Sequence, residues 1–200
     1  NTRIQVEHPV TESITNSDLV EMQIKFALGI DTNLTEQNKI NRTGHAIECR
    51  LYAEDPSKNF LPSPGKISKL KIPNTNLANI RLDIGVDEGD EISFYYDPMI
   101  AKIIAKGSTR VESIKNMLQY LKEFEIEGIN TNKSFLISVL QNKNFEEANF
   151  NTKFIENNLT LFIKKKGDIL PTKQQDKTKI KQEYSDKDVK AFEKIIAKTP

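Results

Sequence analysis

The sequence predicts an α+β domain in which a run of short strands is followed by a group of helices. Strands are predicted between residues 45 and 105, where β-branched and aromatic segments alternate with turns such as Pro62-Ser-Pro-Gly65. Helices are predicted after residue 109, where apolar side chains recur every three or four positions. Because the two kinds of element are segregated along the chain, a mixed or antiparallel sheet with helices is expected, not an alternating fold.

Composition excludes several classes of protein. The 200 residues carry 29 Lys and Arg against 28 Asp and Glu, so no basic field indicates a nucleic-acid partner. Every long apolar run is interrupted by charge, which predicts no membrane span. The single cysteine, Cys49, excludes an internal disulfide framework and fits a reducing compartment. Cys49 as a nucleophile is the alternative to a small apolar strand residue, and no partner residues support it.

The first eight residues alternate between polar and apolar side chains. Asn1, Arg3, Gln5 and Glu7 fall on one side of this pattern, which predicts a half-buried strand that ends at Pro9. A helix is then predicted, with Ser17 as N-cap, Asp18 at its positive end and a stop at Gly29. Its apolar face would carry Val20, Ile24 and Leu28. A polar loop is expected from 31 to 44.

The later elements follow from turn and capping signals. Strands are expected at 45–52, 67–72, 79–84, 91–96 and 100–105. Thr109 and Glu112 form a capping box for a helix that reaches toward Gly128, and Thr131 is expected to cap a second helix. A short helix is expected near 152–158. The charged, apolar-poor segment from Lys164 to Lys190 is expected to be a disordered linker, and a chain that opens on Asn is expected to be a fragment.

The polar side chains of the first segment have the chemistry to hold a small oxyanion. Arg3 has two parallel N–H groups that can bind a carboxylate or carbonate. The Glu7 carboxylate can act as the base that takes a proton from the bound anion. Asn1 has an oxygen suited to Mg²⁺. The pattern alone favours the simpler interpretation, an exposed strand face with ordinary charges, and leaves the oxyanion site as the alternative.

Arg50, on the predicted strand at 45–52, is the second candidate functional residue. Only five of the 29 basic residues are arginine. In a chain so rich in lysine, an arginine indicates a need for the planar guanidinium. Glu48 falls on the same side of the predicted strand, so a surface ion pair of little energetic value is the alternative.

Five segments, in the expected order, resemble the biotin carboxylase family. They are Asn1-Thr-Arg-Ile-Gln-Val-Glu-His-Pro-Val-Thr-Glu12, Gly44-His-Ala-Ile-Glu-Cys-Arg-Leu-Tyr-Ala-Glu-Asp-Pro56, Phe60-Leu-Pro-Ser-Pro-Gly-Lys-Ile67, Tyr95-Tyr-Asp-Pro-Met-Ile-Ala-Lys102 and Gly128-Ile-Asn-Thr-Asn132. The resemblance implies the C-terminal edge of an ATP-grasp domain at 1–30, a biotin carboxylase C-terminal domain at 44–158, and a charged tail at 163–200.

The resemblance implies roles for the residues of the first segment. Asn1 matches a ligand of Mg²⁺, for which Mn²⁺ is an alternative. Arg3, Gln5 and the backbone of Val6 match bicarbonate contacts, and Arg3 also matches a catalytic residue. Glu7 matches the general base that deprotonates bicarbonate for attack on the γ-phosphate of ATP.

Arg50 matches the catalytic arginine that binds biotin. In the family's mechanism, carboxyphosphate breaks down to CO₂ and phosphate, the phosphate removes the biotin N1 proton, and the enolate attacks CO₂. The matched arginine stabilises that enolate. The family's glycine-rich loop and ATP-binding lysines have no counterpart in these residues, so the chain alone is expected to be inactive.

The implied partners are a biotin carboxyl carrier domain or protein, a carboxyltransferase subunit and a second copy of the chain. Residues 81–93 resemble α subunits of acyl-CoA carboxylases, and a stand-alone subunit with a long tail is the alternative. Another bicarbonate-activating ATP-grasp ligase and an inactive dimerisation module are the alternatives. A cytoplasmic location is expected, with the mitochondrial matrix as an alternative.

Overall fold

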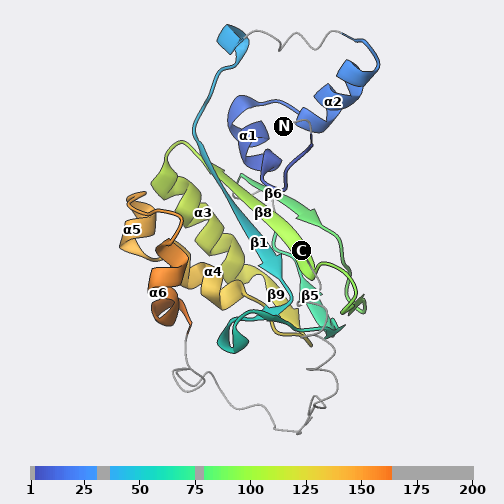
Figure 1. Cartoon of the computed structure of the whole chain (residues 1–200), viewed down its shortest axis with the longest axis vertical. Helices are drawn as coiled ribbons and strands as arrows, with labels where there is room; N and C mark the ends of the chain where they lie inside the picture. The colour runs from blue at the N-terminus through green and yellow to red at the C-terminus, as the bar shows by residue number, and fades with distance from the viewer. Residues whose placement is uncertain (1–2, 31–36, 75–78, 164–200) are drawn as a thin grey trace, which may run out of the picture. The chain divides into compact units, whose positions relative to one another are not determined.

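A three-stranded antiparallel sheet lies at the centre of the computed structural model, which describes residues 3–30, 37–74 and 79–163. Its strands run in the order β1 (His45–Tyr52), β8 (Met99–Gly107) and β6 (Ile80–Ile84) (Figure 1). The strands predicted at 45–52, 79–84 and 100–105 are therefore confirmed. The α+β class is confirmed as well, because helices cover this antiparallel sheet.

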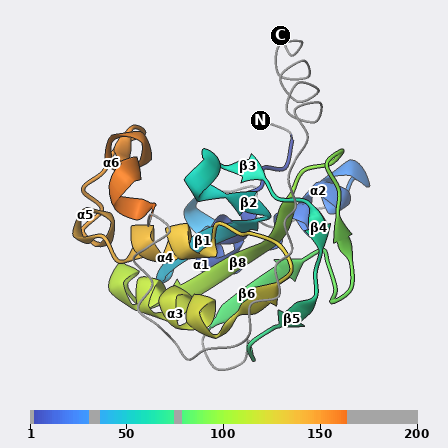
Figure 2. The same cartoon turned by 90° about the horizontal axis from the view of Figure 1, so that it is seen from below.

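One face of the sheet builds the main core. Alternate side chains of β1 and β8 are buried against α3 (Arg110–Glu123), which crosses the sheet (Figure 2). The buried contacts include Ile47, Cys49, Leu51, Ile103, Ile114, Met117 and Leu121. Burial raises the pKa of the Cys49 thiol to about 12, so it stays protonated and inert. Cys49 is thus an apolar strand residue.

The other face of the sheet contacts α1 (His8–Thr15), a helix that the sequence analysis did not predict. The strand predicted over residues 1–8 is wrong for the described residues 3–7, which form bends and turns. Pro9 does not end a strand but lies in the first turn of α1, where proline needs no N–H partner. A strand also requires a partner, and none of the described strands pairs with this segment.

The helix predicted to begin after Ser17 is present as α2 (Leu19–Ala27), and Gly29 follows it in a left-handed conformation. Its N-cap is Asp18, not Ser17, because the Asp18 carboxylate accepts a hydrogen bond of 2.8 Å from the Glu21 amide. The expected apolar face is not buried. Its exposed side chains are Val20, Ile24 and Leu28. Within the polar loop, residues 37–39 form the 3₁₀ turn η1 (Gln37–Lys39).

Short strand pairs surround the sheet. They are β2 (Glu54–Asp55) with β3 (Leu61–Pro62), β4 (Gly65–Lys66) with β7 (Glu91–Ile92), and β5 (Lys69–Lys71) with β9 (Glu125–Glu127). A 3₁₀ turn, η2 (Pro56–Lys58), lies between β2 and β3. The strand predicted at 67–72 is shorter than expected, and that predicted at 91–96 ends at Ile92. The aromatic side chains beyond it, Phe94, Tyr95 and Tyr96, are exposed.

The helical part contains α3, α4 (Lys133–Leu140), α5 (Lys143–Glu146) and α6 (Phe154–Phe162). Thr109 caps α3 as predicted, but the Glu112 carboxylate accepts from the Ser108 amide at 2.8 Å. Asn132 is the N-cap of α4, so the cap predicted at Thr131 is wrong. The expected linker from Lys164 to Lys190 lies outside the described residues. Among the described helices, none has the length and apolarity to cross a membrane.

Candidate active site

Arg50 lies on β1, at one edge of the sheet, on the face that contacts α1. Its Nη2 donates to Oε2 of Glu7 at 3.0 Å, and its Nε donates to Oε1 of Glu48 at 3.1 Å. The Arg50 side chain is 38% exposed, Glu7 is 57% exposed and Glu48 is 6% exposed. The guanidinium therefore lies between a buried carboxylate and a solvent-accessible one, and remains reachable by a ligand.

Glu48 is a buried carboxylate beneath Arg50. Burial raises the pKa of Glu48, while the hydrogen bond from Arg50 and the charges of Arg50 and Lys102 oppose that rise. Lys102 is the cross-strand neighbour of Arg50 on β8, and its Nζ lies 3.3 Å from the carboxylate of Asp83 on β6. Across the three strands the row therefore consists of two cations, Arg50 and Lys102, followed by the carboxylate of Asp83.

Glu12 holds α1 against the sheet face that carries Arg50. Its buried carboxylate accepts from the Leu19 amide at 2.8 Å and pairs with Arg81 of β6. Nδ1 of His8 lies 3.0 Å from the same carboxylate. Burial acts to raise the pKa of Glu12, but the hydrogen bonds from Arg81, Leu19 and His8 bring it below its ordinary value. Because α1 begins immediately after Glu7, this anchor brings Glu7 to Arg50.

The backbone of Arg50 is held from the opposite direction by Asn132. The Asn132 amide donates to the Arg50 carbonyl at 3.1 Å, and its Oδ1 accepts from the Tyr52 amide at 3.0 Å. The Asn132 backbone amide also donates to the Tyr52 carbonyl at 3.2 Å. The side chain thus replaces a missing strand beside the end of β1.

The structure brings together two of the predicted site residues, Glu7 and Arg50. Arg3 and Gln5 are exposed and Val6 is half-buried on the segment before α1. Because this segment is not a strand, Arg3, Gln5 and Glu7 do not share a strand face as predicted. Their bicarbonate contacts stay predictions. The magnesium role of Asn1 lies outside the described residues, and the described residues contain no group of three acidic, histidine or cysteine side chains placed to bind a metal.

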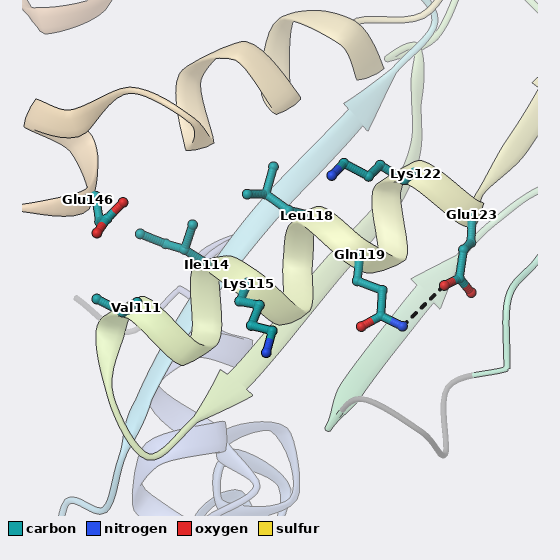
Figure 3. Close-up of a pocket in the computed structure, with 8 residues that line it drawn as sticks. All are labelled: Val111, Ile114, Lys115, Leu118, Gln119, Lys122, Glu123 and Glu146. Atoms are coloured by element: carbon teal, nitrogen blue, oxygen red, sulfur yellow. Dashed lines mark hydrogen bonds between the residues drawn. The ribbon is translucent and has the colours of Figure 1, made fainter.

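The sequence analysis missed Glu12, Arg81, Lys102 and Asn132 as parts of this site. Arg81 and Glu12 are 69 positions apart, so no local pattern joins them. A separate pocket on the outer side of α3 contains none of these residues. Figure 3 shows Val111, Ile114 and Leu118 in a row along α3, with Glu146 of α5 near one end.

Two family models match the chain. Residues 48–157 match the biotin carboxylase C-terminal domain, and residues 1–35 match the ATP-binding domain of the carbamoyl-phosphate synthase L chain. The chain belongs to the biotin carboxylase C-terminal domain family. The first model covers Arg50, Lys102 and Asn132, and the second covers Glu7 and Glu12.

Relatives of this family member are carboxylases. Biotin carboxylase 1 of Bacillus subtilis (strain 168) is 50% identical over 156 residues, which are 78% of this chain and 34% of the relative. The mitochondrial propionyl-CoA carboxylase alpha chain of Homo sapiens is 46% identical over 156 residues, 78% of this chain and 21% of the relative. This chain thus spans about a third or less of the curated relatives it matches.

Solved structures of carboxylases share the fold. The biotin carboxylase domain dimer of 2-oxoglutarate carboxylase from Hydrogenobacter thermophilus, in complex with MgADP, ADP and bicarbonate, matches with a TM-score of 0.78. It is 38% identical, and the match covers 83% of this chain and 36% of that one. The biotin carboxylase subunit of a pyruvate carboxylase matches with a TM-score of 0.78 and 40% identity, over 83% of this chain and 36% of that one.

Proposed function

We propose that this chain is part of an enzyme that carboxylates biotin with bicarbonate and ATP. The observation that carries the proposal is the 3.0 Å contact between Glu7, the candidate base, and Arg50, the candidate biotin-binding cation. These residues lie 43 positions apart, in segments that match two different family models. Their contact joins a base that acts on bicarbonate to a cation that acts on biotin.

The chemistry of the pair follows from its charges. Glu7 accepts the proton of bicarbonate, which Arg3, Gln5 and the Val6 backbone hold in this proposal. A protonated Glu7 no longer carries the negative charge that faces Nη2 of Arg50. The guanidinium then offers that N–H group to the negative charge that develops on the ureido oxygen of biotin. Proton transfer to Glu7 thereby frees the Nη2 group of Arg50 to bind biotin.

The proposal includes the cofactors and partners of a complete carboxylase. Mg²⁺, with Asn1 as one ligand, would neutralise phosphate charge on ATP when bound. Biotin would arrive on a carrier domain or protein, and a carboxyltransferase subunit would use the product. Dimerisation with a second copy is proposed because one of the solved structures similar to this chain is a domain dimer. A cytoplasmic location, or the mitochondrial matrix, is proposed because relatives include a bacterial protein and a mitochondrial one.

A second candidate is another ATP-grasp ligase that activates bicarbonate. The match of residues 1–35 to the ATP-binding domain of the carbamoyl-phosphate synthase L chain favours it. Residues 48–157 favour the biotin-dependent enzyme instead, because they match its own C-terminal domain. Dependence of ATP turnover on biotin distinguishes the two candidates.

The test measures phosphate release by the full-length protein that contains this sequence, with ATP, Mg²⁺ and bicarbonate, with and without free biotin. Biotin is expected to raise the rate, and Arg50→Ala is expected to reduce that increment by about 10²–10³-fold, the effect of losing a charge-stabilising donor. Glu7→Gln is expected to abolish release in both conditions.

Arg42→Ala is the matched control, because Arg42 is an exposed arginine outside the site, and it is expected to leave both rates unchanged. Release that depends on bicarbonate but ignores biotin would assign the chain to the second candidate. An unchanged biotin increment in Arg50→Ala would remove Arg50 from the mechanism.

A further inference from the structure

We propose that Glu48 is a positioning residue for the biotin half of the reaction, which it serves by fixing the guanidinium of Arg50 through Nε. The inference rests on the proposed function and adds to it a residue with no assigned role. Glu48 acts through Arg50 and touches neither bicarbonate nor biotin in this proposal.

The geometry gives Glu48 one task that Glu7 does not perform. Glu48 and Arg50 are two residues apart on β1, so their side chains leave the same face of the strand. The Glu48 carboxylate accepts from Nε, the nitrogen nearest the backbone, whereas Glu7 accepts from the terminal Nη2. A bond at Nε restricts rotation of the guanidinium and leaves the terminal N–H groups available for a ligand.

Glu48 is also held more firmly than Glu7. Its side chain is 6% exposed, compared with 57% for Glu7, so packing restricts its rotamers. Its neighbour across the sheet is Ile104, which is buried. When Glu7 takes a proton, Glu48 remains the carboxylate that orients Arg50.

Stability alone does not account for a carboxylate at this position. Burial raises the pKa of Glu48 despite the opposing charges of Arg50 and Lys102, and the charge of Glu7 adds to the rise. Within the described part of the chain, Oε2 of Glu48 has no hydrogen-bond partner. Ionised Glu48 therefore costs folding free energy, and this cost appears as pH rises from 4.5 through the raised folded-state pKa. A costly buried charge beside a candidate catalytic residue indicates a functional requirement.

The test places Glu48→Ala and Glu48→Gln in the same full-length protein and separates two activities. Glu48→Ala is expected to lower kcat for the biotin-stimulated increment about tenfold to a hundredfold, because the guanidinium loses its orientation. Bicarbonate-dependent phosphate release without biotin is expected to stay within about twofold, since Glu7 and Arg3 are intact. Glu48→Gln keeps an oxygen for Nε, so it is expected to recover part of the increment.

Thermal unfolding separates positioning from a structural role. Glu48→Gln is expected to melt at the same temperature as the parent or higher, because the amide removes the cost of the buried charge. Glu127→Gln is the matched control, since it removes an exposed carboxylate that pairs with Lys69 at 3.1 Å, and both activities are expected to persist. A parallel loss of both activities in Glu48→Gln, or an unchanged increment in Glu48→Ala, would overturn the proposal. A parent protein whose phosphate release ignores biotin would instead refute the proposed function.

Discussion

At the scale of single residues, the site contains two buried carboxylates, Glu12 and Glu48, that pair with arginine. Glu12 is the clearest case, because one carboxylate contacts the Leu19 amide, Arg81 and His8. These contacts lower the pKa of Glu12 even though burial alone would raise it. A carboxylate with a lowered pKa stabilises the folded state in its ionised form.

Glu12→Gln is therefore expected to lower the free energy of unfolding of the chain at pH 7 by about 1–3 kcal/mol, the cost of losing hydrogen bonds to a charged group. The stabilisation by ionised Glu12 is present above its ordinary pKa of 4.5 and is lost as pH falls through the lowered folded-state value. Urea unfolding followed by far-ultraviolet circular dichroism at pH 7 and in acid measures both effects.

Glu21→Gln is the control for this prediction. Glu21 pairs with Lys25 on the exposed side of α2 at 2.6 Å, so its loss is expected to change the free energy of unfolding by less than about 0.5 kcal/mol. An equal loss in both variants, or a Glu12→Gln deficit that does not shrink in acid, would contradict the role given to Glu12.

Sequence predicted the identity of the central residues and not their supports. Glu7 and Arg50 could be predicted from the sequence because each lies in a segment that resembles the family. Glu12 and Arg81 could not, because their pairing depends on how α1 lies on the sheet. The sequence predicted only that Glu48 lies on the same strand face as Arg50. It did not predict that the Glu48 side chain is buried, which depends on the folded chain.

At the scale of elements, the strands on which the site residues lie are those that local sequence patterns predict well. β1 alternates between core and polar face over its whole length, and its bounds agree with the prediction at 45–52. α1 was missed because seven residues of alternation precede it and proline was taken as an end, not as a first turn. β9 was missed because its three residues become a strand only through pairing with β5.

The junction between β1 and α4 gives a prediction at this scale. Asn132→Asp keeps the oxygen that accepts from the Tyr52 amide and removes the N–H group that donates to the Arg50 carbonyl. The variant is expected to lose about 1–3 kcal/mol of unfolding free energy, because the Arg50 carbonyl loses its side-chain donor in a part-buried position. Urea unfolding measures the loss.

Asn142→Asp tests the same chemical change where it should be harmless. Asn142 caps α5 by accepting from the Asn144 amide at 2.9 Å, and aspartate caps a helix as well as asparagine does. If the two variants are equally stable, the Asn132 amide does not hold β1 as described.

At the scale of the whole molecule, the chain carries one half of the proposed reaction. In the proposed function Glu7 is the base and Arg50 is the cation on the biotin side, and the two residues lie in segments that match two different family models. The match to Bacillus subtilis biotin carboxylase 1 covers 34% of that protein. The exposed apolar side chains of α2 form a surface suited to contact with further protein.

The 200-residue chain alone is therefore expected to show no biotin-dependent ATP hydrolysis, because it matches only 34% of Bacillus subtilis biotin carboxylase 1, and in the proposed function its residues Glu7 and Arg50 act on bicarbonate and biotin, not on the nucleotide. Phosphate release with ATP, Mg²⁺, bicarbonate and biotin measures this directly. Covalently joining the chain to the part of Bacillus subtilis biotin carboxylase 1 outside the 156-residue match is expected to create biotin-dependent release. Arg50→Ala in that chimera should lose the biotin increment. Turnover by the unjoined chain would show that the nucleotide is bound within these residues and would sink the prediction.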